Sequence, residues 1–175
     1  MSILEIELKA PVSGADEIRE KILSIGGIFQ KVQQETDYYY NHPSRDFAVT
    51  GEAFRIRVEN GVSRLTYKGP KLGGIAKTRV ERETDIGDSD IMKEILNSLG
   101  FVSSGVVSKK REYFALDDAT VTIDMVADLG VYVEIEMIGD DRSRIEPKIL
   151  AIADRLDLHT FESRSYLAMI LGTVD

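Results

Sequence analysis

The sequence predicts an α+β fold in which one antiparallel sheet or barrel carries helices on its outside. Segments with strand character outnumber helical segments, and most connections are short, which favours hairpins over the crossovers that parallel strands need. Many strand segments also alternate apolar and charged residues. The 175 residues suffice for a hydrophobic core, and we expect a single domain over residues 1–175.

Four segments have the periodicity or composition of a helix. Residues 14–25 place Ile18, Ile22 and Ile25 on one face, and Gly26 follows as a stop signal. The other helices are expected at residues 88–99, 144–156 and 164–171. Pro147 falls in the first turn of the third helix, where its missing N–H is tolerated.

The strand segments are separated by short turns. The sequence Glu59-Asn60-Gly61 between two of them predicts a tight hairpin, because Asn and Gly accept the backbone conformation of such turns. Strands are expected at residues 3–10, 28–40, 53–58, 63–68, 76–86, 105–115, 120–126 and 131–138.

Composition excludes several kinds of site. The chain has 0 Cys, so disulfides, thiolate zinc sites and cysteine nucleophiles are excluded. The net charge of −8 argues against a nucleic-acid partner, which favours basic domains. We also expect no secretory signal, no membrane partner and a cytoplasmic location, because no segment has the apolar length that targeting or spanning requires.

Charged residues repeat at every second position of the expected strands, so they share one face of each strand. Glu5, Glu7 and Lys9 form one such row, and Arg55 and Arg57 form another. Further rows are Thr66 and Lys68; Lys77, Arg79, Glu81 and Glu83; Lys109 and Arg111; Thr122 and Asp124; and Glu134 and Glu136.

Two arrangements explain these rows. In the simpler one, each strand presents its charged face to water. In the other, the sheet closes into an inverted barrel whose apolar faces meet the helices and whose charges line a tunnel. The charged residues are mostly acidic on some strands and mostly basic on others, and this favours the tunnel. Buried charges need partners of opposite sign, and a polyphosphate with a divalent metal supplies both negative and positive charge.

The rows resemble the signature of the CYTH superfamily, the triphosphate tunnel metalloenzymes. The N-terminal ExExK motif is Glu5-Ile6-Glu7-Leu8-Lys9, and Glu134 and Glu136 form an ExE pair near the other end. The intervening motifs follow in the family's order: Arg55 and Arg57, Leu65 to Pro70, Arg79 with Glu81 and Glu83, Lys109 and Arg111, Asp124, and Gly130. Ser165-Tyr166 also matches near the end, and the β-strand motifs are most similar to the class IV adenylyl cyclase branch.

The resemblance implies a closed, eight-stranded antiparallel β-barrel with helices packed outside, Mg²⁺ or Mn²⁺ as cofactor, and a homodimer by analogy. The implied metal ligands are Glu5, Glu7, Asp124, Glu134 and Glu136. The implied triphosphate ligands are Lys9, Arg55, Arg57, Lys68, Lys77, Arg79, Lys109 and Arg111. The implied catalytic residues are Glu5, Glu7, Lys9 and Asp124, with Glu81 and Glu83 supporting them.

Three functions fit such a tunnel. An adenylyl cyclase would convert ATP into cyclic AMP and pyrophosphate by attack of the ribose 3′-hydroxyl on the α-phosphorus. A triphosphatase would direct water at the terminal phosphorus of thiamine triphosphate, a nucleotide or tripolyphosphate. A polyphosphate sensor would bind without turnover. The cyclase-like motifs favour the first function, and ATP is the expected partner.

Three further features lie outside these assignments. Residues 71–74, rich in glycine, form either a mobile flap over the tunnel mouth or an ordinary hairpin loop. The tyrosines at 38, 39 and 40 are either packing residues or a stacking surface for a base. His42 and His159 lie outside the matched motifs, and no ligand role is expected for them.

Overall fold

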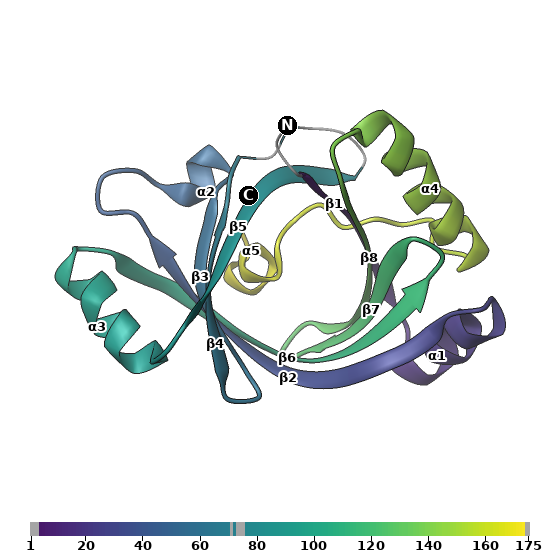
Figure 1. The fold of residues 1–175 in the computed structure, drawn as a ribbon, viewed down its shortest axis with the longest axis horizontal. Helices are drawn as coiled ribbons and strands as arrows, with labels where there is room; N and C mark the ends of the chain where they lie inside the picture. Colours follow the sequence, from purple (N-terminus) through teal and green to yellow (C-terminus); the bar gives the residue numbers. More distant parts are fainter. Residues whose placement is uncertain (1–3, 71, 73–75, 174–175) are drawn as a thin grey trace.

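Eight strands close into one antiparallel barrel in the computed structural model, which describes residues 4–70, 72 and 76–173 (Figure 1). The strands are β1 (Leu4–Val12), β2 (Ile28–Asn41), β3 (Ala53–Glu59), β4 (Val62–Lys68), β5 (Lys77–Ile86), β6 (Val102–Leu116), β7 (Ala119–Val126) and β8 (Gly130–Gly139). Around the barrel they follow the order β1-β5-β4-β3-β2-β6-β7-β8, with β8 pairing back to β1. The predicted closed antiparallel barrel is therefore confirmed.

In the described residues, five helices accompany the barrel: α1 (Ala15–Ser24), α2 (Phe47–Thr50), α3 (Ser89–Ser98), α4 (Arg142–Arg155) and α5 (Tyr166–Leu171). All but α2 were expected from the sequence, but α4 begins at Arg142, so Pro147 lies in its second turn and not in its first. The α2 helix is a single turn that begins where the Asp46 carboxylate accepts a hydrogen bond from the Ala48 N–H, 3.0 Å away. A helix of 4 residues is too short to show an apolar period, so periodicity could not reveal it.

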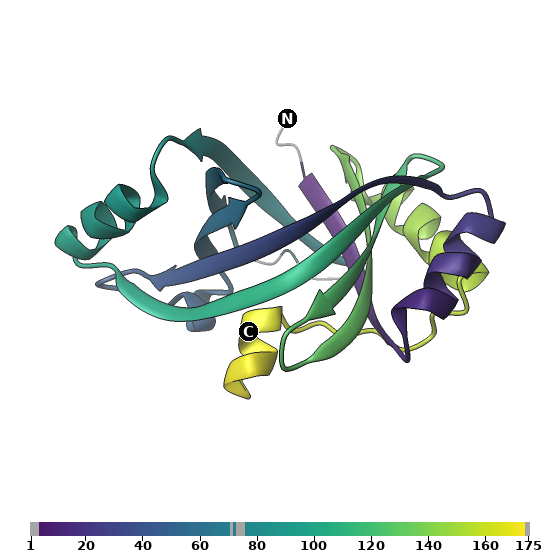
Figure 2. The ribbon, with the colours of Figure 1, turned by 90° about the horizontal axis from the view of Figure 1, so that it is seen from below.

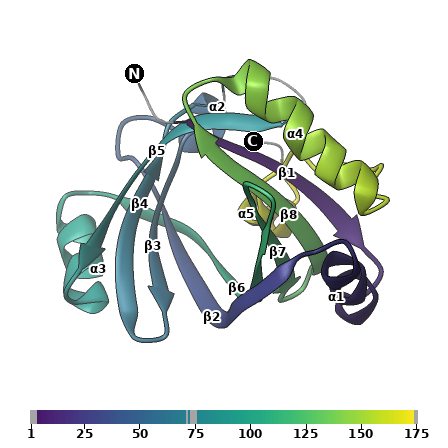
Figure 3. The same cartoon turned by 45° about the vertical axis from the view of Figure 1, so that its right-hand side comes forward.

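The larger hydrophobic core lies outside the barrel wall, under α1 and α4. Outward-facing Ile6 and Leu8 of β1 and Ile123 of β7 are buried there, and Ile22 of α1 and Ile149 of α4 pack against this surface. Figure 3 shows α1 and α4 covering this side of the barrel. The apolar rows of the strands therefore point outward, and the charged rows are left to face the lumen.

A second core anchors α3 on the opposite side of the molecule. Leu96 of α3 is buried against outward-facing Tyr40 of β2 and Ile56 of β3. The two longest strands, β2 and β6, run side by side across the whole width of the molecule and join the α1 side to the α3 side (Figure 2).

One helix lies across an end of the barrel rather than along its wall. The α5 helix lies across one end of the barrel, where Tyr166 is buried against Tyr39 and Val107 on the inner faces of β2 and β6, together with Val126 of β7. These inward positions are apolar or aromatic, unlike the charged positions farther along the same strands. Apolar and aromatic side chains thus predominate at the α5 end of the lumen.

No helix in the described part of the chain is long and apolar enough to cross a membrane.

Candidate active site

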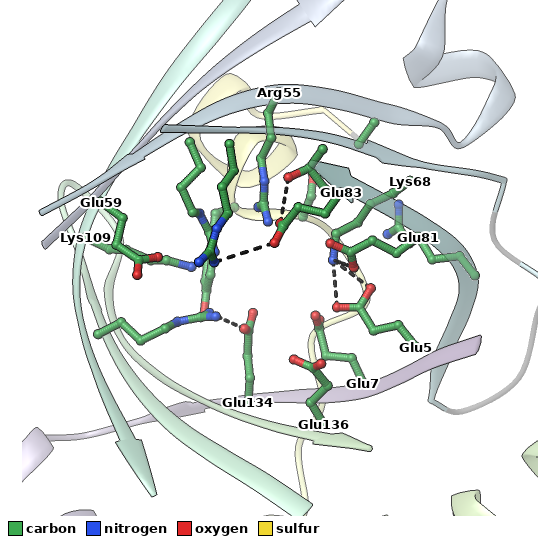
Figure 4. A pocket seen from close by; sticks show the side chains of 18 of the residues that line it. Glu5, Glu7, Arg55, Glu59, Lys68, Glu81, Glu83, Lys109, Glu134 and Glu136 are labelled. Atoms are coloured by element: carbon green, nitrogen blue, oxygen red, sulfur yellow. Dashed lines mark hydrogen bonds and ion pairs between the residues drawn. The ribbon is translucent and has the colours of Figure 1, made fainter. Parts of the chain in front are cut away.

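The charged rows line a cavity of about 460 Å³ inside the barrel (Figure 4). The sequence-predicted residues that line it are Glu5, Glu7, Lys9, Arg55, Arg57, Lys68, Arg79, Glu81, Glu83, Lys109, Arg111, Glu134 and Glu136. Two predicted residues are not among them. Asp124 is 0% exposed and lies behind the lining, and the side chain of Lys77 falls outside the described part of the structure.

Because the strands of a closed barrel are tilted and staggered, their registers stack the inward side chains in layers. The layer at α5 contains Lys9, Tyr39, Ala53, Val107, Val126 and Tyr132. The next contains Glu7, Asp37, Arg55, Lys68, Arg79, Lys109, Asp124 and Glu134. The third contains Glu5, Glu35, Arg57, Thr66, Glu81, Arg111, Thr122 and Glu136. The fourth layer lies at the end of the barrel opposite α5, which we call the mouth. It contains Gln33, Glu59, Arg64, Glu83, Tyr113, Thr120 and Ile138.

Carboxylates gather on one wall of the two central layers, on β1, β5 and β8. Lys68 Nζ reaches Glu5 Oε2 at 2.6 Å and Glu81 Oε2 at 2.9 Å. Glu7 and Glu136 lie on the same side of the cavity as Glu5 (Figure 4). Burial and the negative charges of Glu5 and Glu7 raise the pKa of Glu136 to about 7, and burial also raises the pKa of Glu5. This wall therefore carries more negative charge than Lys68 neutralises.

The oxygen ligands of the acidic wall are the kind that a hard divalent cation prefers. Its ligands are carboxylate oxygens, which Mg²⁺ and Mn²⁺ prefer, and a cation there would relieve the repulsion that raises the pKa of Glu136. Within residues 4–70, 72 and 76–173, no three acidic or histidine side chains already converge as a finished metal site. The side chains of Glu5, Glu7 and Glu136 would therefore have to turn toward an ion.

The opposite wall is basic, and buried acids behind it hold its cations. Arg57 Nε donates to Asp37 Oδ1 at 2.7 Å, and Arg55 Nη1 donates to the other carboxylate oxygen at 3.1 Å. Glu35 lies 3.1 Å from Arg57 Nη2 and 3.4 Å from Lys109 Nζ. Burial alone would raise the pKa of Glu35, but the positive charges of Arg111, Lys109 and Arg57 lower it to about 2. Glu35 and Asp37 are thus permanently charged supports.

Asp124 occupies a similar supporting position on β7. Arg111 donates to both of its carboxylate oxygens, Lys109 Nζ lies 3.3 Å from Oδ2, and the Tyr166 hydroxyl donates to Oδ2 at 2.8 Å. Arg111 also contacts Glu134. With its oxygens engaged by four donors, Asp124 is placed to orient Arg111 and Lys109. Its role as a metal ligand stays a prediction.

Arg79 differs from the other lining cations. It is 7% exposed, lines the cavity and lies opposite Glu5 in the strand register. In the described part of the chain, no hydrogen bond or ion pair joins its guanidinium to another residue. A buried guanidinium without a carboxylate partner leaves its full set of donors available to an anion in the cavity.

The sequence interpretation missed several side chains of the site. Lys31, Glu59 and Arg64 line the mouth, where Arg64 Nε donates to Asp85 Oδ1 at 3.0 Å and Lys31 Nζ lies 3.9 Å from Glu59. The alternation rule could have found Arg64, which shares a strand face with Thr66 and Lys68. Glu35 and Asp37 could have been found in the same way, because they alternate along β2.

The three tyrosines at the end of β2 divide between the two faces of the barrel. Tyr38 and Tyr40 point outward and pack in the second core, under α3, whereas Tyr39 is buried beside Tyr166. Tyr38 and Tyr40 are therefore packing residues, whereas Tyr39 both packs against Tyr166 and lines the cavity. Of the predicted flap at residues 71–74, positions 71, 73 and 74 lie outside the described residues.

Comparisons with known proteins agree with this geometry. A Methanocaldococcus jannaschii protein named "Putative adenylate cyclase MJ0240" is 38% identical over 134 residues, or 77% of each chain. Adenylate cyclase CyaB of Aeromonas hydrophila is 26% identical over 93% of this chain and 86% of its own. The structure of the PH1819 protein of Pyrococcus horikoshii is 38% identical, covers 96% of this chain and 98% of its own, and has a TM-score of 0.87.

A more distant structure shares the fold. HpAC1 of Hippeastrum, described with a dominant triphosphatase activity, is 19% identical, covers 100% of this chain and 98% of its own, and has a TM-score of 0.71. The family model called CYTH domain matches residues 4–166, nearly the whole of the barrel and its helices. The chain therefore belongs to the CYTH domain family.

Proposed function

We propose that the protein is a divalent-metal-dependent adenylyl cyclase that converts ATP into cyclic AMP and pyrophosphate. The observation that carries the proposal is the division of the lumen into an acidic wall, centred on Glu5 and Glu136, and a basic wall, centred on Arg57 and Arg111. Such a lumen matches the two components of a metal–triphosphate complex, which would lie between the walls. The names of two relatives support the choice of ATP.

In this proposal, different residues bind the phosphates and the metal ion. Arg79 and the paired cations of the basic wall bind the β- and γ-phosphates and neutralise the charge that develops on pyrophosphate as it leaves. Glu5, Glu7 and Glu136 would hold Mg²⁺ or Mn²⁺, which when bound favours ionisation of a nearby hydroxyl and neutralises phosphate charge. The ribose 3′-hydroxyl loses its proton to solvent and its oxygen forms a bond to the α-phosphorus. The bond from that phosphorus to the bridging oxygen breaks, and pyrophosphate leaves.

A triphosphatase is the second candidate. The same two walls would hold tripolyphosphate, thiamine triphosphate or a nucleotide, with water rather than the 3′-hydroxyl as the nucleophile. The observation that favours it is the triphosphatase activity described for HpAC1, which has the same fold. The two reactions differ in which phosphorus lies beside the acidic wall.

Product analysis separates these functions. The protein is incubated with ATP, tripolyphosphate or thiamine triphosphate in the presence of Mg²⁺ or Mn²⁺, and the products are separated by chromatography. Cyclic AMP with pyrophosphate is the expected result, whereas orthophosphate release would identify a triphosphatase, and binding without turnover would identify a sensor. Glu136→Gln should abolish turnover, and Glu94→Gln, on the exposed surface of α3, should not.

A further inference from the structure

We propose that Ile138, at the mouth of the tunnel, is the contact for the nucleoside of the substrate and determines selectivity for a nucleoside triphosphate over inorganic tripolyphosphate. This inference rests on the proposed function, because it assigns the part of the substrate that the charged walls do not bind.

The lining of the lumen indicates which end of the substrate lies deep. At the α5 end, Tyr166 packs against Tyr39, Val107 and Val126, so the cavity is lined there mainly by aromatic and apolar side chains. The two central layers hold the ionic residues, including Arg79, which has no carboxylate partner among the residues that the structure describes. A triphosphate chain therefore gains its interactions in these layers, and the sugar and base remain toward the mouth.

Ile138 breaks the ionic pattern at the point where the nucleoside would lie. Along β8, the inward-facing residues Glu134 and Glu136 are followed by Ile138, which lines the cavity and is 67% exposed. Among the described lining residues, the only other aliphatic side chain is Ala53, which lies at the α5 end. An exposed branched side chain on a charged wall gains free energy when a flat aromatic group covers it.

The neighbours of Ile138 connect this contact to the chemistry. Ile138 pairs with Glu5 across the β1–β8 register and lies two residues beyond Glu136 on the same face. A base resting on Ile138 would bring the ribose and the α-phosphorus close to these carboxylates. Attack by the 3′-hydroxyl requires that placement, whereas hydrolysis at the terminal phosphorus does not.

Binding measurements with two ligands test the proposal. Isothermal titration calorimetry with Mg²⁺ compares α,β-methylene ATP, which cannot release pyrophosphate, with tripolyphosphate. Ile138→Thr keeps a β-branched strand residue and removes apolar surface, so it should weaken binding of the ATP analogue roughly tenfold. Binding of tripolyphosphate should change by less than about twofold, because that anion has no base that could pack against the side chain at position 138. Ile91→Thr, at a 57% exposed position on α3 outside the cavity, is the matched control for both ligands.

The outcomes distinguish this inference from the proposed function. Equal weakening of both ligands, or unchanged binding of the ATP analogue, would overturn the role of Ile138 and leave the triphosphate tunnel intact. If the unaltered protein binds neither ligand, the proposed function fails, and this inference fails with it.

Discussion

At the scale of single residues, the lining cations fall into two kinds. Arg57 donates to Asp37 at 2.7 Å and lies 3.1 Å from Glu35. Removing its side chain would therefore leave two buried carboxylates without this cationic partner. Arg79 has no such partner in the described part of the chain. The same substitution should therefore have opposite consequences at the two positions.

We expect Arg79→Ala to weaken binding of Mg²⁺–tripolyphosphate at least about tenfold, because charge-assisted hydrogen bonds to phosphate are strong. It should leave the free energy of unfolding unchanged or higher, because an unpaired buried cation is removed. Arg57→Ala should instead lower the free energy of unfolding by about 3–5 kcal/mol. Urea unfolding and calorimetry measure the two quantities, and a large loss of stability in Arg79→Ala would contradict this interpretation.

Glu136 should make the metal-free protein less stable as pH rises. Its pKa of about 7 exceeds the ordinary value of 4.5, so between these values the folded state binds more protons than the unfolded state, and stability falls with rising pH. Glu136→Gln should remove this slope and gain on the order of 2 kcal/mol over the parent at pH 8. Urea unfolding in a chelator at pH 5 and pH 8 gives the comparison.

Glu35 provides an internal contrast for that experiment. Its pKa is lowered to about 2, so its contribution to stability is complete above pH 4.5 and is lost as pH falls toward 2. The two effects therefore occupy separate pH ranges. Parallel pH profiles for Glu136→Gln and the parent between pH 5 and pH 8 would count against the raised pKa of Glu136.

At the scale of elements, α5 is tied to the basic wall by one side chain. The Tyr166 hydroxyl donates to Asp124, and the ring lies 4.2 Å from Lys9 Nζ and 5.0 Å from Lys109 Nζ. Lys9 Nζ also donates to the Arg164 carbonyl oxygen at 2.5 Å, so the segment before α5 is bound to β1. The short helix thereby supports residues that contact the substrate in the proposed function.

Tyr166→Phe should lower the free energy of unfolding by about 1–3 kcal/mol, because it removes a buried hydrogen bond to a charged group and keeps the ring. Tyr132→Phe is a matched control, since its ring packs 5.4 Å from that of Tyr166 and its hydroxyl makes no hydrogen bond in the described residues. Chemical denaturation of the two variants measures the difference, and equal losses would mean that the hydroxyl of Tyr166 contributes nothing.

The elements also show how far sequence reasoning reaches. Alternation along β1, β3 and β5 predicts the lining residues because the two-residue period of a strand fixes which side chains share a face. The same rule assigns Asp124 to the inner face but cannot tell a lining residue from one covered by Arg111 and Tyr166, since that depends on side chains from distant elements. The position of α5 across the barrel end depends on tertiary packing in the same way.

At the scale of the whole molecule, the charge of the tunnel explains how a chain of net charge −8 could accept an anion. Among the described lining residues, nine are lysine or arginine and seven are glutamate. Three buried acids, Glu35, Asp37 and Asp124, stand behind the basic wall and offset its excess. The lumen is therefore close to neutral, and its cations are mostly committed to carboxylates.

A nearly neutral lumen should bind a bare triphosphate weakly and a metal complex well. Without metal, the anion meets only Arg79 as an uncommitted cation among the described residues and is repelled by the wall of Glu5, Glu7 and Glu136. With Mg²⁺, that wall becomes attractive, because the ion neutralises carboxylate and phosphate charge together. Calorimetry at constant ionic strength should show tripolyphosphate binding about a hundredfold tighter with Mg²⁺ than with a chelator, a coupling of roughly 3 kcal/mol. Glu136→Gln should reduce this coupling by weakening the metal-bound complex while slightly improving metal-free binding. Equal affinity in the two conditions would mean that the acidic wall takes no part in holding the ligand.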